Sequence, residues 1–111
     1  MNQEIRQTMD ALRKALPKYW KIRLAAMSNC TIEVYHSDPR GGGVLIRWGR
    51  QVEMIYPNRD KNGKLLQLCP DTEGSGLFKG PKWRERLVES AVSAAQKFED
   101  KFGFPGKHCS I

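Results

Sequence analysis

PKWRERLVESAVSAAQKFEDKFG, residues 81–103, decides the fold of this chain because it carries the strongest helical pattern in the sequence. Apolar side chains recur there every three or four residues, which places them on one face of a helix. Pro81 suits the first turn of such a helix, and Gly103 suits its C-terminal cap. The pattern predicts a long final helix with one buried face. Its apolar positions are Trp83, Leu87, Ala91, Ala94, Phe98 and Phe102.

A second apolar stripe, near the N-terminus, predicts another helix. Its members Ile5, Met9, Leu12 and Leu16 are separated by four, three and four residues, the spacing of one helical face. Pro17 ends the pattern because its ring is incompatible with a helix interior.

Between the two helices the apolar period changes to two, which is the period of a half-buried strand. Residues 20–27 and 30–36 alternate clearly, and residues 44–48 and 52–56 form two more extended runs. Residues 64–69 form a run short enough to be a closing strand. Turn-forming residues separate these runs. We therefore expect a four- to five-stranded antiparallel meander sheet.

The order helix, antiparallel sheet, helix predicts an α+β protein with both helices on one sheet face, where their apolar stripes share a core. Helices on opposite faces are the alternative. We expect residues 1–103 to form a single domain and residues 104–111 a loosely attached C-terminal tail. A chain of 111 residues buries roughly two-thirds of its unfolded surface, enough for a core without disulfides.

The three cysteines predict a reducing, cytoplasmic location, because they are odd in number, widely spaced and not preceded by a signal-like segment. No apolar run is long enough to cross a bilayer. The sequence contains no C-x-x-C or H-x-x-x-H unit, and the best candidate ligand pair is the adjacent His108 and Cys109. We expect no metal and no cofactor.

The sequence also lacks a convincing catalytic set. His36 lies on the apolar side of its predicted strand and is interpreted as a core histidine. The carboxylates are scattered, and residues 71–77 lack the lysine-serine end of a phosphate-binding loop, so they are interpreted as a flexible connector. A non-enzymatic protein is predicted, with a small hydrolase or transferase that uses Cys or His as the alternative.

Positive charge is the strongest indication of a partner. Nineteen Lys and Arg residues against twelve Asp and Glu residues give a formal net charge of +7. Cations crowd the start of the final helix, where free backbone amides attract anions and added cations oppose the helix dipole. An anionic partner would explain that arrangement; otherwise these side chains are merely solvated while Trp83 packs in the core. The cluster consists of Lys79, Lys82, Arg84 and Arg86.

Two further basic groups extend this hypothesis. The first lies beside the glycine loop at residues 41–43, and alternation directs Arg47 away from Trp48, so only part of it can face one ligand. Its candidate binding residues are Arg40, Arg47, Trp48 and Arg50. The second consists of Arg13, Lys14, Lys18, Lys21 and Arg23. The sequence alone does not place the three groups side by side.

The order of elements and the basic start of the final helix resemble double-stranded RNA-binding domains. The chain departs from them by its additional strand material and by Trp83 and Glu85, which interrupt the lysine-rich phosphate clamp of that family. No site or function is therefore carried over from the resemblance.

Together these features predict a small basic binding protein that docks a polyanion. The polyanion is either nucleic acid or an acidic surface of a nucleic-acid-handling protein. The alternative is a protein-binding inhibitor or adaptor of the type found among phage and mobile-element accessory proteins, with exposed aromatic and arginine anchors.

Overall fold

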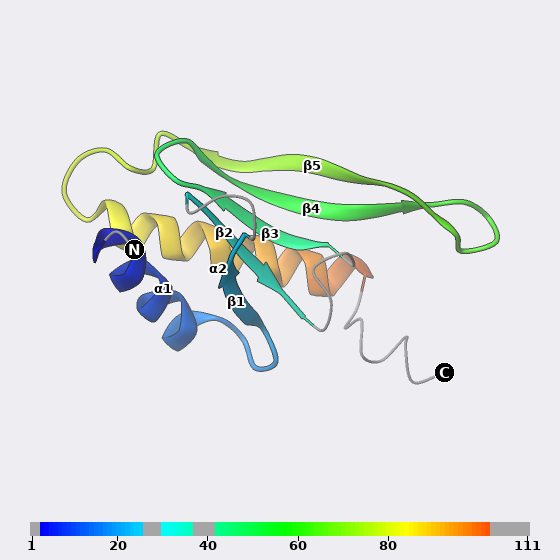
Figure 1. Cartoon of the computed structure of the whole chain (residues 1–111), viewed down its shortest axis with the longest axis horizontal. Coiled ribbons are helices and arrows are strands. Elements are labelled where there is room, and N and C mark those ends of the chain that lie inside the picture. The colour runs from blue at the N-terminus through cyan, green and yellow to red at the C-terminus, as the bar shows by residue number, and fades with distance from the viewer. Residues whose placement is uncertain (1–2, 26–29, 37–41, 103–111) are drawn as a thin grey trace.

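A computed structural model of the chain describes residues 3–25, 30–36 and 42–102. Within these residues two helices flank a five-stranded sheet (Figure 1). The strands follow the order β1-β2-β3-β4-β5, and every neighbouring pair is antiparallel. The predicted α+β meander is confirmed. Its elements are α1 (Gln3–Ala15), β1 (Lys21–Leu24), β2 (Thr31–Tyr35), β3 (Gly43–Arg47), β4 (Gln51–Arg59), β5 (Leu65–Ser75) and α2 (Trp83–Phe102).

Both helices pack on one face of the sheet, as expected from their two apolar stripes. A single core contains the buried side chains of α1 and α2 together with every second side chain along β2, β3 and β4. Figure 1 shows the two helices lying next to each other below the long strands. The buried members include Leu12, Ile32, Ile46, Leu87 and Phe98, each no more than 1% exposed.

The close contact between α2 and the sheet depends on small side chains. Ala91, Ala94 and Ala95 are completely buried on the inner face of α2. On the strand side, a Cβ atom at Gly74 would lie 2.8 Å from Leu77 and 2.9 Å from the Ser90 hydroxyl oxygen. A glycine inside a strand commonly marks such a close approach, so Gly74 makes room for the helix.

Strand β5 is longer than the sequence predicts. Its eleven residues run through the segment around Asp71 that the sequence pattern indicates as a flexible connector. The polarity and glycine of this segment suggest a loop, but β5 lies at the edge of the sheet, where polar side chains reach water. The Lys97 ammonium lies 2.8 Å from the Glu73 carboxylate and joins α2 to this part of the strand.

Pro57 and Pro70 lie within strands and not at strand ends, where the sequence pattern places them. Both positions tolerate a missing backbone donor. Pro70 is on the edge strand β5, and Pro57 lies beyond Ile55, the last residue of β4 that pairs with β3. Proline is accepted at such edges because no ladder hydrogen bond is needed on the open side.

Helix α2 begins two residues after Pro81. Lys82 adopts a left-handed conformation with φ of 60°, and its carbonyl accepts a 3.2 Å hydrogen bond from the Arg86 amide. The predicted cap at Gly103 and the predicted tail at residues 104–111 lie outside the described residues. Neither described helix has the length and apolarity needed to cross a membrane.

His36 lies on the buried side of the sheet, directly after β2, as the alternation predicted. It is 7% exposed, and its ring centroid lies 5.1 Å from that of Trp20 in an edge-to-face contact. Burial lowers the pKa of His36 below its ordinary value; the Glu99 carboxylate opposes this shift, and the Lys21 ammonium adds to it. The neutral imidazole is therefore the form that fits the folded protein.

We expect Phe98→Ala to lower the free energy of unfolding by about 3–5 kcal/mol, because it removes a large, fully buried ring from the centre of the core. Denaturant unfolding measures the change. Ser93→Ala, on the exposed face of the same helix, is the control and should change stability by less than about 0.5 kcal/mol. Equal stability of the two variants would contradict the packing of α2 described above.

The stability of the protein should decrease as the pH falls through about 6.5, the ordinary pKa of histidine. The unfolded chain then binds a proton that folded His36 resists because of its lowered pKa. The decrease should end once the pH is below the pKa of the folded state. Thermal unfolding between pH 8 and pH 4 measures this effect, which should shrink in His36→Phe but persist in the control variant His108→Gln.

Candidate functional site

Three aromatic rings bring together two basic groups that are distant in the sequence. Trp48 follows β3, Phe78 lies in the loop between β5 and α2, and Trp83 is the first residue of α2. The ring centroid of Trp48 lies 5.0 Å from that of Phe78 and 5.6 Å from that of Trp83. The turn between β3 and β4 and the loop before α2 therefore lie at the same end of the molecule.

Exposed cations surround this aromatic cluster. Arg50 extends from the turn between β3 and β4, and Lys79 and Lys82 extend from the loop before α2. Arg86 is also exposed, and its guanidinium donates hydrogen bonds to the carbonyl oxygens of Lys79 and Pro81. These bonds hold the loop that carries both lysines. We call Arg50, Lys79, Lys82 and Arg86 the basic end.

Arg84, in contrast, serves the packing of the two helices. Its Nε donates a 3.1 Å hydrogen bond to the Thr8 hydroxyl oxygen in α1, and its guanidinium carbon lies 4.8 Å from the ring centroid of Trp83. Thr8 is completely buried. The sequence places Arg84 in the anion-binding cluster; in the structure its described side-chain contacts are with Thr8 and Trp83.

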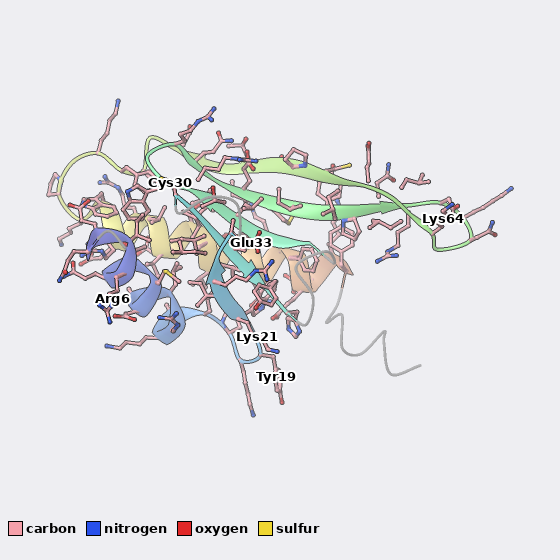
Figure 2. The ribbon with its side chains drawn as sticks, viewed as in Figure 1. Arg6, Tyr19, Lys21, Cys30, Glu33 and Lys64 are labelled. Carbon is pink, nitrogen blue, oxygen red and sulfur yellow. The ribbon has the colours of Figure 1, made fainter. Side chains whose placement is uncertain are left out.

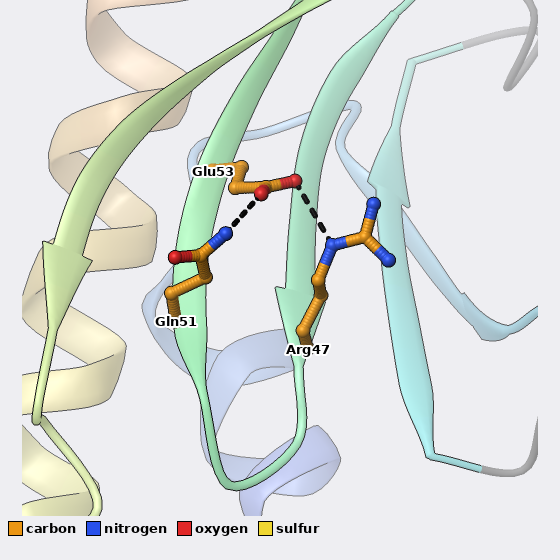
Figure 3. Close-up of polar contacts among 3 residues, drawn as sticks. All are labelled: Arg47, Gln51 and Glu53. Carbon is orange, nitrogen blue, oxygen red and sulfur yellow. Dashed lines mark hydrogen bonds and ion pairs between the residues drawn. The ribbon is translucent and has the colours of Figure 1, made fainter.

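Arg47 faces the opposite side of the sheet from Trp48, as alternation predicted. Its Nε lies 3.2 Å from Oε2 of Glu53, and the other carboxylate oxygen of Glu53 accepts a hydrogen bond from the Gln51 amide (Figure 3). Glu53 is only 5% exposed. Arg47 therefore compensates a buried carboxylate and does not join the basic end. Arg40, the remaining predicted member of this group, lies outside the described residues.

Trp48, a further predicted binding residue, lies within the aromatic cluster. It is half-buried and makes edge-to-face contacts with both other rings of the aromatic cluster. Its described contacts are those of a scaffold that holds two chain segments together. Phe78 belongs to the same scaffold; in the sequence it directly precedes Lys79 and is one of the aromatic residues interleaved with the cations at the start of the final helix.

The third basic group, on α1 and β1, contains two cations with acidic partners. Arg13 Nη1 lies 2.9 Å from Asp10 Oδ1, and Arg23 Nε lies 2.6 Å from Glu33 Oε2. Figure 2 shows Lys21 and Glu33, which lie on the neighbouring strands β1 and β2. These pairs reduce the net charge of that surface, so the basic end is the stronger candidate.

An open groove of about 690 Å³ lies between α1 and the start of α2. Two cations and two carboxylates line it together with apolar groups, so the groove has a mixed charge. It does not itself favour an anion, and we place the candidate site on the exposed cations of the basic end, of which Lys82 alone also lines the groove. The lining residues are Ala11, Lys82, Trp83, Arg84, Glu85, Val88 and Glu89.

The described part of the chain contains no group of three His, Cys, Asp or Glu side chains arranged to hold a metal ion. His108 and Cys109, the best pair in the sequence, lie outside it. No protein-family model, curated protein or solved structure matches this chain.

Arg47→Ala should lower the free energy of unfolding by about 1–2 kcal/mol, because it removes one of the two described partners of the buried Glu53 carboxylate. The exposure of Arg47 to solvent keeps the loss below that of a fully buried pair. Adding Glu53→Gln should recover part of the loss, since a neutral amide does not need the cation. Denaturant unfolding of both variants checks this, with Arg50→Ala as the exposed control.

Proposed function

We propose that this chain is a non-enzymatic binding module that docks a polyanion at the basic end. The observation that supports this most is the aromatic cluster of Trp48, Phe78 and Trp83, which gathers exposed cations from two distant segments. Arg50, Lys79 and Lys82 project from turns and loops held by that cluster. Cations concentrated on one end attract a chain of phosphates more strongly than the same charges dispersed over the surface.

The arginines and the lysines near this end make different contacts, and the difference supports binding of phosphate. Arginine forms planar, directional hydrogen bonds, whereas lysine acts as a compact charge on a flexible stem. At this end, Arg84 and Arg86 bond to groups of the protein itself, while Lys79 and Lys82 are exposed. The mobile point charges are thus the groups offered to a partner.

The packing of the aromatic rings favours backbone contact over base recognition. Proteins that bind single strands present aromatic faces on which bases stack. Here the rings of Phe78 and Trp83 stack on each other at 5.7 Å, and Trp48 contacts both edge to face. A nucleic acid at the basic end is therefore expected to be held through its phosphates, with little dependence on base sequence.

We expect Lys79→Gln/Lys82→Gln to weaken nucleic-acid binding and to reduce its salt dependence by about 0.9 for each phosphate that the variant no longer neutralises. Fluorescence anisotropy with a labelled 30-base-pair duplex at several KCl concentrations measures both quantities. The control is Lys14→Gln/Lys18→Gln, which removes the same charge from the end of α1 and should retain most of the affinity. Arg84 is kept intact because its substitution would disturb the contact between the helices.

The outcome of this experiment separates the two sources of negative charge. A wild-type protein that binds the duplex with a steep salt dependence supports nucleic acid as the partner. If instead an acidic protein is the partner, that complex should survive nuclease treatment, and the lysine variant should associate with it more slowly. Equal duplex binding by the wild type and both variants would remove the basic end from the site.

A further inference from the structure

Strands β4 and β5 continue as a two-stranded arm beyond the other strands. β3 reaches only as far as Ile55 of β4, so residues 56–59 and 65–69 pair with each other alone among the described strands. Figure 1 shows this hairpin extending past the helices, at the opposite end from the loop before α2. The molecule measures 46 Å along its longest axis and 24 Å across. We call residues 56–69 the arm.

The tip of the arm has a defined structure that leaves its lysines exposed. One carboxylate oxygen of Asp60 accepts hydrogen bonds of 2.9 Å from the backbone amides of Asn62 and Lys64. Arg59 donates a 3.0 Å hydrogen bond to the Gly63 carbonyl oxygen. The acidic side chain thus closes the turn, while Lys61 and Lys64 are exposed, and Figure 2 shows Lys64 at the tip.

The arm also exposes apolar side chains next to its cations. Leu65, Leu66 and Leu68 are 37%, 60% and 39% exposed, and the other large hydrophobic residue of comparable exposure in the described chain is Tyr19. An isolated hairpin is only marginally stable in water, and clustered exposed apolar groups commonly mark a contact surface. The arm therefore has the properties of a binding element.

We propose that the arm enters the major groove of double-stranded DNA. This inference rests on the proposed function and names the form of the polyanion. The major groove is wide enough for a two-stranded ribbon. Lys61 and Lys64 would contact the flanking phosphates. The leucines would lie against apolar base edges such as the thymine methyl group.

A duplex fits the arm better than a single strand does. Residues 59–69, RDKNGKLLQLC, contain no aromatic side chain, and the ring of Tyr56 at the base of the arm already stacks on Phe102 at 5.9 Å. Single-strand binding depends largely on aromatic stacking, which this segment cannot provide. Cations, short polar groups and leucines suit the phosphates and the base edges of a duplex.

The test compares binding of a 30-base-pair duplex and of one of its strands by the wild type and two arm variants. Lys61→Gln/Lys64→Gln should reduce duplex affinity about tenfold or more at low salt, with a shallower salt dependence. Leu66→Ala should reduce duplex affinity while leaving the salt dependence unchanged. Single-strand binding should change little in Leu66→Ala, and the charge-matched control Lys14→Gln/Lys18→Gln should retain duplex affinity.

Failure of this inference is distinguishable from failure of the proposed function. If the basic-end variant Lys79→Gln/Lys82→Gln loses affinity while both arm variants bind the duplex like the wild type, the arm proposal is wrong and the proposed function stands. If the wild type binds neither the duplex nor its single strand, the arm proposal is wrong, and the proposed function then requires an acidic protein partner whose complex survives nuclease treatment. A wild-type dimer that dissociates on Leu66→Lys, with duplex binding unchanged, would assign the leucines to a second copy of the chain and overturn the arm proposal.

A tethered probe tests the position of the arm independently of affinity. Iron-EDTA is attached to Asn62→Cys in a chain whose three natural cysteines are replaced by serine. It should cleave the bound duplex at sites clustered on both sides of one groove. The same probe on Ser93→Cys, on the exposed face of α2, should cleave it weakly and diffusely. Equal cleavage from both positions would contradict insertion of the arm.

Discussion

The close approach of α2 to the sheet is the constraint on which the rest of the structure depends. Three fully buried alanines line the inner face of the helix, and Phe98 fills the space beyond them. Gly42 adapts the sheet to that ring, because a Cβ atom there would lie 3.2 Å from Phe98 and 2.4 Å from the Ile55 carbonyl oxygen. With α2 held at this distance, its first turn contacts Trp48 through Trp83 and Thr8 through Arg84.

The placement of α2 explains why the positively charged side chains have different roles. Arg47 and Arg84 use their guanidinium groups within the protein, one beside a buried carboxylate and the other between the helices. Lys79 and Lys82 lie in the loop before α2, where the backbone carries them into solvent. A directional donor is suited to fixed protein geometry and a flexible charge to a variable partner, so counting cations overstates the size of the binding surface.

Most of the fold followed from the sequence, because each helix and most strands carry a periodic apolar pattern that leads to one shared core. The extension of β5 did not follow, since Gly74 resembles a loop residue until the helix packed over it is known. The candidate site was only partly predictable. The sequence revealed the cations, but it does not show that Glu53 and Thr8, which lie on other elements, bond to Arg47 and Arg84. The arm was missed because Pro57 and Pro70 suggested strand ends.

The meander order of the sheet has a consequence for how the chain reaches this structure. Every strand pairs with its neighbour in sequence, so each pairing closes only a short loop and costs little chain entropy. The contact between Arg84 and Thr8 joins residues 76 positions apart. All five strands lie between these two residues in the sequence. Local pairings of this kind form faster than distant ones. Folding should therefore begin in the central hairpins, and the docking of α1 on α2 should complete the core as a late step.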